Sequence, residues 1–418
     1  MVKIISRITE RSAQPSYGSS ISLRIGLALG LSVYYLNYST TFDEGQIDAA
    51  SPLTMLGRLL SVMLIVWSLK PFKLRSDASV LLVFLYIAAA TSFFLSIAIS
   101  GETNDILFTN TLIQLPVLVA LSATTQRVDY ARWFRLVGII LTLQVIGDVI
   151  IGLAGDALWL SGAFIGGLGN PSSFGFLCCL LVTFYLFHPK AGSLKWLFVL
   201  IISIGAFKSE SLFAVISLGI VYFLWMIRRW GWLIAGGLIM GVAVTGIYIL
   251  DENTTGEQIS FIQHKLSAVG ALVDAVDYDV ESSASVSLRI QIHSETFAAI
   301  EDDPLRLFYG HFEGKQYWPM DSQLLTYLGS FGVIMLMIFL SLHVAWLKMS
   351  FKNKICDGGF IFISLVLFSL IFLTNRILDY FPVATIYFLL ISMAIQSRTK
   401  RSKNLQAAEI LVGVRKFD

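Results

Sequence analysis

Seven basic side chains stand apart from the clusters that hold most of the Lys and Arg residues of this chain. They are Arg58, Lys208, Lys265, Arg289, Arg306, Lys315 and Arg376. A charge beside apolar segments is costly unless it is used, and an arginine is especially suited to phosphate because its planar guanidinium can donate two parallel hydrogen bonds. Near these cations in sequence stand Glu210, His293 and Asp321, which are residue types that can transfer protons. The chemistry to consider is therefore anion binding with proton transfer.

The composition indicates which elements must position these residues. The chain has 418 residues, of which 56% are apolar and only 14% are charged, against roughly 25% charged residues in soluble domains. Such sparse charge cannot cover a soluble surface, so we expect an integral membrane protein. A formal net charge of +2 gives no basic field for nucleic acid, and three cysteines provide neither a disulfide framework nor a metal motif.

Apolar runs of helix length predict an all-α bundle of about 12 membrane spans. They fall at residues 21–38, 54–69, 79–100, 106–123, 133–153, 172–188, 195–207, 211–227, 232–250, 323–346, 358–374 and 381–396. With both termini in the cytoplasm, 22 of the 30 basic residues lie in cytoplasmic segments, as the positive-inside bias requires. Residues 1–20 then form a retained cytoplasmic leader, and residues 397–418 form a cytoplasmic tail.

One large outer loop, residues 251–322, separates the nine spans expected within residues 21–250 from the three spans expected within residues 323–396. It holds 13 acidic and four basic residues, so an anion there must be bound by particular arginines rather than by a general positive field. The apolar spacing between Ile259 and Val276 predicts an amphipathic helix. A second helix is expected at residues 287–300, where Arg289 and His293 share one face.

Three stretches between residues 160 and 340 carry a family resemblance. The first comprises residues 161–164 and 169–175, the second is the hairpin at residues 208–211, and the third runs from Arg289 through Pro304 and Gly310 to residues 321–332. In this order they resemble the O-antigen polymerase and ligase superfamily of bacterial envelopes, the Wzy and WaaL type. Two departures stand out: Lys-Ser-Glu at 208–210 replaces the family's Ser-Arg pair, and Asp321 replaces the His usual in ligases, which favours a polymerase.

The resemblance implies a membrane glycosyltransferase at the periplasmic face of the bacterial inner membrane. Its donor would be an undecaprenyl diphosphate-linked oligosaccharide, and a chain-length regulator protein is a conceivable partner. By this resemblance Arg289, with help from Lys208, Arg376 or Arg58, would hold the diphosphate, and Asp321 or Glu210 would orient or deprotonate the acceptor hydroxyl. The remaining substrate-binding candidates are Arg306, His293 and Asn170. Neither a metal nor a cofactor is expected, because basic side chains can supply the positive charge.

Each candidate also has a structural alternative. Three arginines could form ion pairs: Arg289 with Glu281 or Asp279, Arg306 with Asp302 or Asp303, and Arg58 with Asp148. The alternative for three hairpin residues is to anchor their hairpins; these are Lys208, Glu210 and Arg376. The alternative for Asp321 and Asn170 is to begin helices. Two other functions stay open, an O-antigen ligase that transfers glycan to the lipid A core and a transporter or flippase for lipid-linked oligosaccharides. The transporter is disfavoured because no inverted repeat is visible and the isolated charges gather at the outer side.

Overall fold

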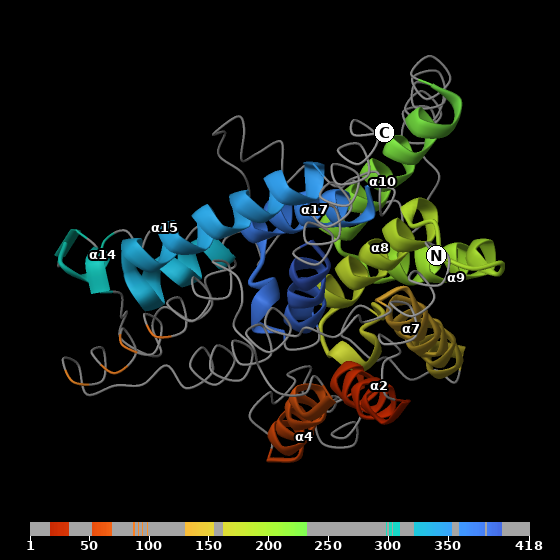
Figure 1. The fold of residues 1–418 in the computed structure, drawn as a ribbon, viewed down its shortest axis with the longest axis horizontal. Helices are drawn as coiled ribbons and strands as arrows, with labels where there is room; N and C mark the ends of the chain where they lie inside the picture. Colours follow the sequence, from red (N-terminus) through yellow and green to blue (C-terminus); the bar gives the residue numbers. More distant parts are fainter. Residues whose placement is uncertain are drawn as a thin grey trace, which may run out of the picture.

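The computed structural model describes part of the chain. The described residues are 17–32, 52–68, 130–153, 162–231, 304–309, 322–352, 359–380 and 383–394, together with Ile87, Thr91, Phe94, Ala98, Ala298, Glu301 and Asp302. Within this part every regular element is a helix and none is a strand (Figure 1). The fold class expected from the sequence is thereby confirmed at the level of an all-helical protein.

Most of the described helices overlap the predicted apolar runs. The described helices are α2 (Tyr17–Leu31), α4 (Pro52–Ser68), α7 (Tyr130–Leu153), α8 (Pro171–Phe187), α9 (Lys195–Lys208), α10 (Leu212–Trp230), α14 (Arg306–Tyr309), α15 (Gln323–Lys352), α17 (Phe360–Thr374) and a helix Val383–Ala394, with 3-10 turns η2 (Gly166–Leu168) and η4 (Ile377–Asp379). Helix α2 begins before the run at 21–38 and ends at Leu31, and α14 lies in none of these runs. The expected spans at 79–100, 106–123 and 232–250, most of the loop 251–322 and both terminal segments 1–16 and 395–418 lie outside the described residues, apart from single helical positions.

Several of these helices are apolar enough to cross a membrane. Among the described residues, Tyr130–Leu153, Leu212–Arg229 and Phe331–Lys352 are also long enough to do so. Shorter apolar helices include Pro171–Phe187 and Phe360–Thr374. These elements are compatible with a helical membrane protein.

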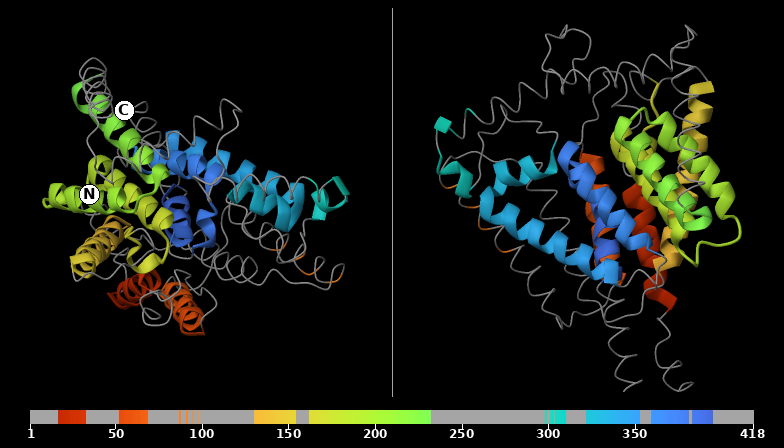
Figure 2. Two further views of the ribbon diagram at one scale, coloured as in Figure 1. Left: turned by 180° about the vertical axis from the view of Figure 1, so that it is seen from behind. Right: turned by 90° about the horizontal axis from the view of Figure 1, so that it is seen from above.

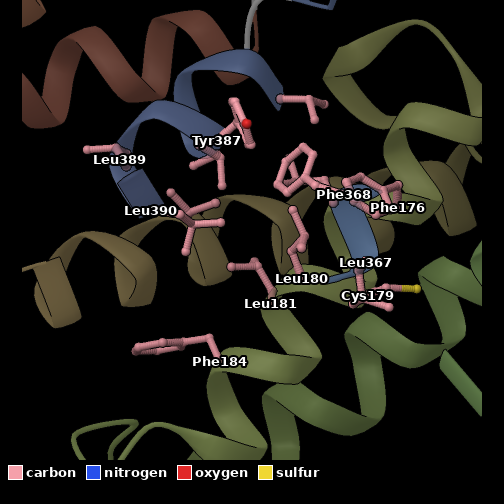
Figure 3. Close-up of a cluster of buried hydrophobic side chains, with 14 of the residues drawn as sticks. Phe176, Cys179, Leu180, Leu181, Phe184, Leu367, Phe368, Tyr387, Leu389 and Leu390 are labelled. Carbon is pink, nitrogen blue, oxygen red and sulfur yellow. The ribbon is translucent and has the colours of Figure 1, made fainter. Parts of the chain in front are cut away.

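Helix α8 forms the centre of the described bundle. Its side chains from Ser173 to Tyr185 are all buried, and it packs against α7, α9, α10 and α17. Figure 3 shows Phe176 and Leu180 of α8 beside Phe368 of α17, with Tyr387 of the helix Val383–Ala394 nearby. A helix that is apolar on every side can be stable only when neighbours or lipid surround it, which explains its central place.

Ring contacts show that α8 and α17 run antiparallel. The ring centroid of Phe184, near the end of α8, lies 5.3 Å from that of Phe360 at the start of α17. Phe176, near the start of α8, lies 4.9 Å from Phe368 in the second half of α17. The beginning of α8 and the end of α17 therefore lie at the same end of the bundle, which carries the candidate residues.

Helix α15 is broken at Gly332. Its backbone there has φ 76° and ψ 176°, so a short helix from Gln323 is followed by a longer one that continues to Lys352. A left-handed φ of this kind favours glycine because glycine has no Cβ. Helix α14 packs against α15. Before α14, the single positions Ala298, Glu301 and Asp302 are helical, so helical residues occur beyond residue 300, where the expected helix ends.

Helices α2 and α4 form a closely packed pair beside α7 (Figures 1 and 2). Gly26 of α2 permits the close approach, because a Cβ on it would lie 3.0 Å from the carbonyl oxygen of Ser61. The hydroxyl of Ser61 donates a hydrogen bond to the carbonyl oxygen of Gly26. Leu56, Met63 and Trp67 of α4 point away from the core and are exposed, as expected for side chains that face lipid.

Candidate functional site

A glycine-rich loop at residues 162–170 joins the first stretch of the resemblance to α8. Gly162, Gly166 and Gly169 have positive φ values of 75°, 51° and 69°, so the loop makes turns that other residues adopt at a cost. Asp148 of α7 holds it in place. One carboxylate oxygen accepts hydrogen bonds from the backbone N–H groups of Ile165 (3.1 Å) and Gly166 (2.9 Å).

Gly166 and Gly167 of the loop are packed tightly against α2, α7 and α8. A Cβ on Gly167 would clash with the carbonyl oxygen of Leu31 and the amide of Gln144, and one on Gly166 would clash with the ring of Phe174. The Gln144 side-chain amide donates to the carbonyl oxygen of Leu31 at 3.0 Å, so it links α7 to the end of α2. The loop therefore forms part of a rigid scaffold.

Asn170 begins α8 as its N-cap residue. Its side-chain oxygen accepts a hydrogen bond of 3.0 Å from the backbone N–H of Ser173, and Pro171 occupies the first helical turn. This arrangement is the structural alternative considered for Asn170. Its contact with a sugar stays a prediction.

The hairpin between α9 and α10 carries two candidates, Lys208 and Glu210. Ser209 is buried and donates to the carbonyl oxygen of Ala206 at 2.7 Å, and Ser211 caps α10 by accepting from the N–H of Ala214 at 3.4 Å. These bonds fix a tight turn in which both charged side chains are only half-buried. Glu210 has φ 53°, and among the described residues it is the one non-glycine in the left-handed region.

The first two stretches of the resemblance meet in the structure. The backbone N–H of Phe164 donates to the carbonyl oxygen of Lys208 at 2.9 Å. Gly175 of α8 lies against the hairpin, because a Cβ there would clash with the hydroxyl of Ser209 and approach Ala214 to 2.7 Å. Segments more than 30 residues apart in sequence are thus held together by backbone and small side chains.

The beginning of α15 holds the hairpin that carries Arg376. The buried side chain of Gln323 accepts a hydrogen bond of 2.7 Å from the backbone N–H of Leu378. The hydroxyl of Ser322 donates to the carbonyl oxygen of Phe372 at 3.1 Å. Arg376 is half-buried in this turn. Ser322 and Gln323 belong to the last part of the third stretch, residues 321–332, and this part therefore lies against the segment of Arg376.

Arg58 is buried in α4, with only 4% of its surface exposed. Ser61, one turn further along α4, binds Gly26 of α2, and the end of α2 binds Gln144 of α7. Asp148 lies one turn beyond Gln144 and is 1% exposed. Arg58 and Asp148 are therefore buried on two helices that both pack against α2, and their ion pair stays a prediction.

These candidates share one end of the bundle, which we call the candidate-site end. It is defined by Asn170, Lys208, Glu210, Gln323 and Arg376. Asn170 starts α8 and Arg376 follows α17, and the ring contacts above place these two ends together. The bond from Phe164 to Lys208 places the α9–α10 hairpin there as well. The end thus presents two half-buried cations and one half-buried carboxylate in fixed turns.

The other candidates are not placed. Arg289, His293 and Asp321 lie outside the described residues, and only the backbone of Arg306, the first residue of α14, is described. Within the described part no group of three or more His, Cys, Asp or Glu side chains could hold a metal ion.

Sequence reasoning missed a buried polar chain in the helices. His343 of α15 contacts the hydroxyl of Tyr387 through Nδ1 and the hydroxyl of Ser369 through Nε2, each at 2.7 Å. Ser369 in turn donates to the carbonyl oxygen of Leu365 at 3.0 Å. These bonds are all satisfied when neutral His343 carries its proton on Nε2 and accepts from Tyr387. A histidine inside an apolar run is the one feature of the sequence that could have indicated this chain. The sequence does not indicate that its partners lie on two other helices.

Comparison with known proteins adds no family assignment. No protein-family model matches the chain, and no curated protein sequence matches it. The resemblance to O-antigen polymerases therefore rests on the three stretches and their arrangement, and what it implies is taken up as a proposal.

Proposed function

We propose that the protein is a polysaccharide polymerase of the Wzy type in the inner membrane of a bacterium. It transfers a growing glycan from undecaprenyl diphosphate to a new lipid-linked repeat unit at the periplasmic face, which is the candidate-site end. The observation that carries the proposal is that two separate hairpins present Lys208 and Arg376 at one end of an apolar bundle, each in a turn fixed by hydrogen bonds.

Fixed cations suit the chemistry of this transfer. The acceptor hydroxyl oxygen forms a bond to the anomeric carbon while the bond from that carbon to the diphosphate oxygen breaks. The diphosphate leaves with the electron pair, so negative charge grows on it. Cations that are already in place stabilise this charge without reorganisation, which is commonly the largest contribution to such catalysis. The hydroxyl proton passes to a carboxylate.

The roles follow from the family resemblance and from residue type, and for Lys208, Arg376 and Glu210 also from their position in the structure. Arg289 is the principal diphosphate ligand, with Lys208, Arg376 and Arg58 in support, and Arg306 and His293 contribute from the large loop. Glu210 or Asp321 accepts the proton of the acceptor hydroxyl. Glu210 suits this role because its turn keeps the carboxylate half-exposed at the candidate-site end. A base must lie within hydrogen-bond reach of the hydroxyl it deprotonates.

The test replaces the proposed cations one at a time in cells whose own gene is deleted. Arg289→Ala, Arg376→Ala and Lys208→Ala are expected to shorten or abolish the glycan ladder on a gel at normal protein levels. Lys190→Ala is the matched control, because Lys190 is an exposed cation in the α8–α9 turn at the opposite end. Wild-type chain lengths in Arg289→Ala would remove its assigned role.

Deletion of the gene separates the polymerase from the ligase. Loss of a polymerase leaves single repeat units on the acceptor, whereas loss of a ligase accumulates long lipid-linked polymer. The second outcome would replace the proposal by the ligase.

The break in α15 gives the transporter one supporting observation. Transporters bind substrates at discontinuous helices, and α15 is interrupted at Gly332. Purified protein in liposomes with lipid-linked repeats on one side distinguishes the two functions. Polymer formation without an added energy source supports the enzyme, and movement of the lipid across the bilayer without polymer supports the transporter.

A further inference from the structure

The end of the bundle opposite the candidate-site end is strongly basic. We call it the basic end; its cations come from α7, the α8–α9 turn, the start of α9, α10 and α15. They are Arg132, Arg135, Lys190, Lys195, Arg228, Arg229, Lys348 and Lys352. The Asp and Glu residues that the structure describes, among them Asp148 and Glu210, lie in other segments. The basic end therefore suits an anionic partner.

Two tryptophans and a lysine are in contact where α9 begins and α10 ends, and an arginine follows one helical turn after one of the tryptophans. The rings of Trp196 and Trp225 meet edge to face, with centroids 5.6 Å apart. The ammonium of Lys195 lies over the Trp196 ring, 5.1 Å from its centre. Arg229 is exposed and follows Trp225 by one helical turn, so it lies on the same face of α10. We call these four residues the Trp–Lys–Arg group.

An exposed apolar stripe runs along α9 from this group. Trp196, Leu200, Ile204 and Phe207 recur at helical spacing, and their exposed fractions are 51%, 62%, 45% and 46%. A stripe of this kind on a helix apolar enough to lie in a membrane faces acyl chains. At its beginning stand the tryptophans and cations, which are residue types that favour the level of lipid headgroups.

We propose that the Trp–Lys–Arg group binds the headgroup of one anionic phospholipid whose acyl chain lies along the α9 stripe. Lys195 and Arg229 contact the phosphate, and the tryptophan pair holds the glycerol region at the membrane surface. Charge complementarity selects an anionic headgroup, because Lys195 and Arg229 are cations and α9 and α10 contain no Asp or Glu. The adjoining stripe favours a lipid over a free phosphate ion, because a phosphate ion has no apolar part that could contact the stripe. Such basic sites between helices are suited to acidic lipids.

The test is native mass spectrometry of the full-length protein in detergent, titrated with phosphatidylglycerol or with phosphatidylcholine of the same acyl chains. Wild-type protein is expected to retain phosphatidylglycerol in preference to phosphatidylcholine. The double variant Lys195→Gln/Arg229→Gln is expected to weaken phosphatidylglycerol binding by about fivefold for each charge removed. The matched control Lys190→Gln/Lys348→Gln removes two cations of the same end outside the group and is expected to keep the preference.

Three results would overturn the proposal. They are a double variant that retains phosphatidylglycerol as the wild type does, a control that loses it equally, and competition by inorganic phosphate at the lipid's own concentration. All four substituted positions are exposed or half-exposed at helix ends, so the variants are expected to fold. The glycan ladder is a separate readout, so failure of this proposal is distinguishable from failure of the proposed function.

Discussion

Replacing Glu210 by glycine separates the fold of the α9–α10 hairpin from its chemistry. Glu210 has φ 53°, and a residue with a Cβ in this region costs roughly 1–2 kcal/mol. Glycine removes that cost, but it also lowers the free energy of unfolding by about 0.5–1 kcal/mol because it raises the entropy of the unfolded chain. The net expectation for Glu210→Gly is a gain of about 0.5–1 kcal/mol in the free energy of unfolding, or about two- to fivefold in the equilibrium constant.

The same variant is expected to lose the proposed polymerase activity, because it removes the half-buried carboxylate. Reversible unfolding in mixed detergent micelles measures stability, and the glycan ladder measures activity. Glu210→Gln is the matched control, since it keeps the backbone cost and side-chain size but removes the charge. It is expected to be as stable as the wild type and as inactive as the glycine variant.

Two results would refute this reasoning. If Glu210→Gly destabilises the protein, the turn does not require a left-handed residue. If both variants keep a wild-type ladder, the carboxylate has no part in the reaction and the hairpin merely joins two helices.

Three further predictions test the scaffold by the same unfolding assay. Gly175→Ala is expected to lower the free energy of unfolding by about 1–3 kcal/mol, because the added methyl group meets the Ser209 hydroxyl. The control Gly219→Ala, with nothing within 4 Å of the new methyl group, is expected to be neutral or stabilising. Equal effects of the two substitutions would refute the close packing of Gly175 against the hairpin. Asp148→Ala leaves two buried N–H groups without their acceptor and is expected to cost about 2–4 kcal/mol, so a neutral result would contradict the loop's attachment. His343→Phe removes two hydrogen bonds between helices and is expected to cost about 1–2 kcal/mol, and unchanged stability would show that the polar chain adds nothing.

The sequence predicts the helices well because each helix is a local pattern. Apolar runs locate α7, α8, α9, α10 and α17 to within a few residues, and Asn170-Pro171 signals the start of α8. The break in α15 was not foreseen, because a lone glycine in an apolar run is compatible with a continuous helix. Its left-handed φ is visible only in the folded backbone.

The partners of the candidate residues could not be predicted, because they are distant in sequence and involve backbone groups. Gln323 binds an N–H group 55 residues away, and nothing in the pattern around either position marks the other. Gln144 was overlooked for the same reason, since a single amide in an apolar helix does not reveal what it caps. The sequence shows Lys208 and the glycine-rich loop only as successive motifs. It does not indicate that the two are in contact.

The way the candidate-site end is held separates its scaffold from its charges. Phe164, Leu378 and Gly166 are fixed through their backbone N–H groups, and the acceptors are Lys208 C=O, Gln323 and Asp148. The side chains of Lys208, Glu210 and Arg376 are absent from these bonds. Substitutions at Lys208 and Glu210 should therefore change the proposed activity while leaving the unfolding free energy nearly constant or, for Glu210→Gly, raised. Substitutions at Gln323 or Asp148 should change stability first, and activity only through it. A charge variant that lost both together would mean that the cation or carboxylate is a structural part of its turn, and the anion-binding role would then have to rest on the arginines of the large loop.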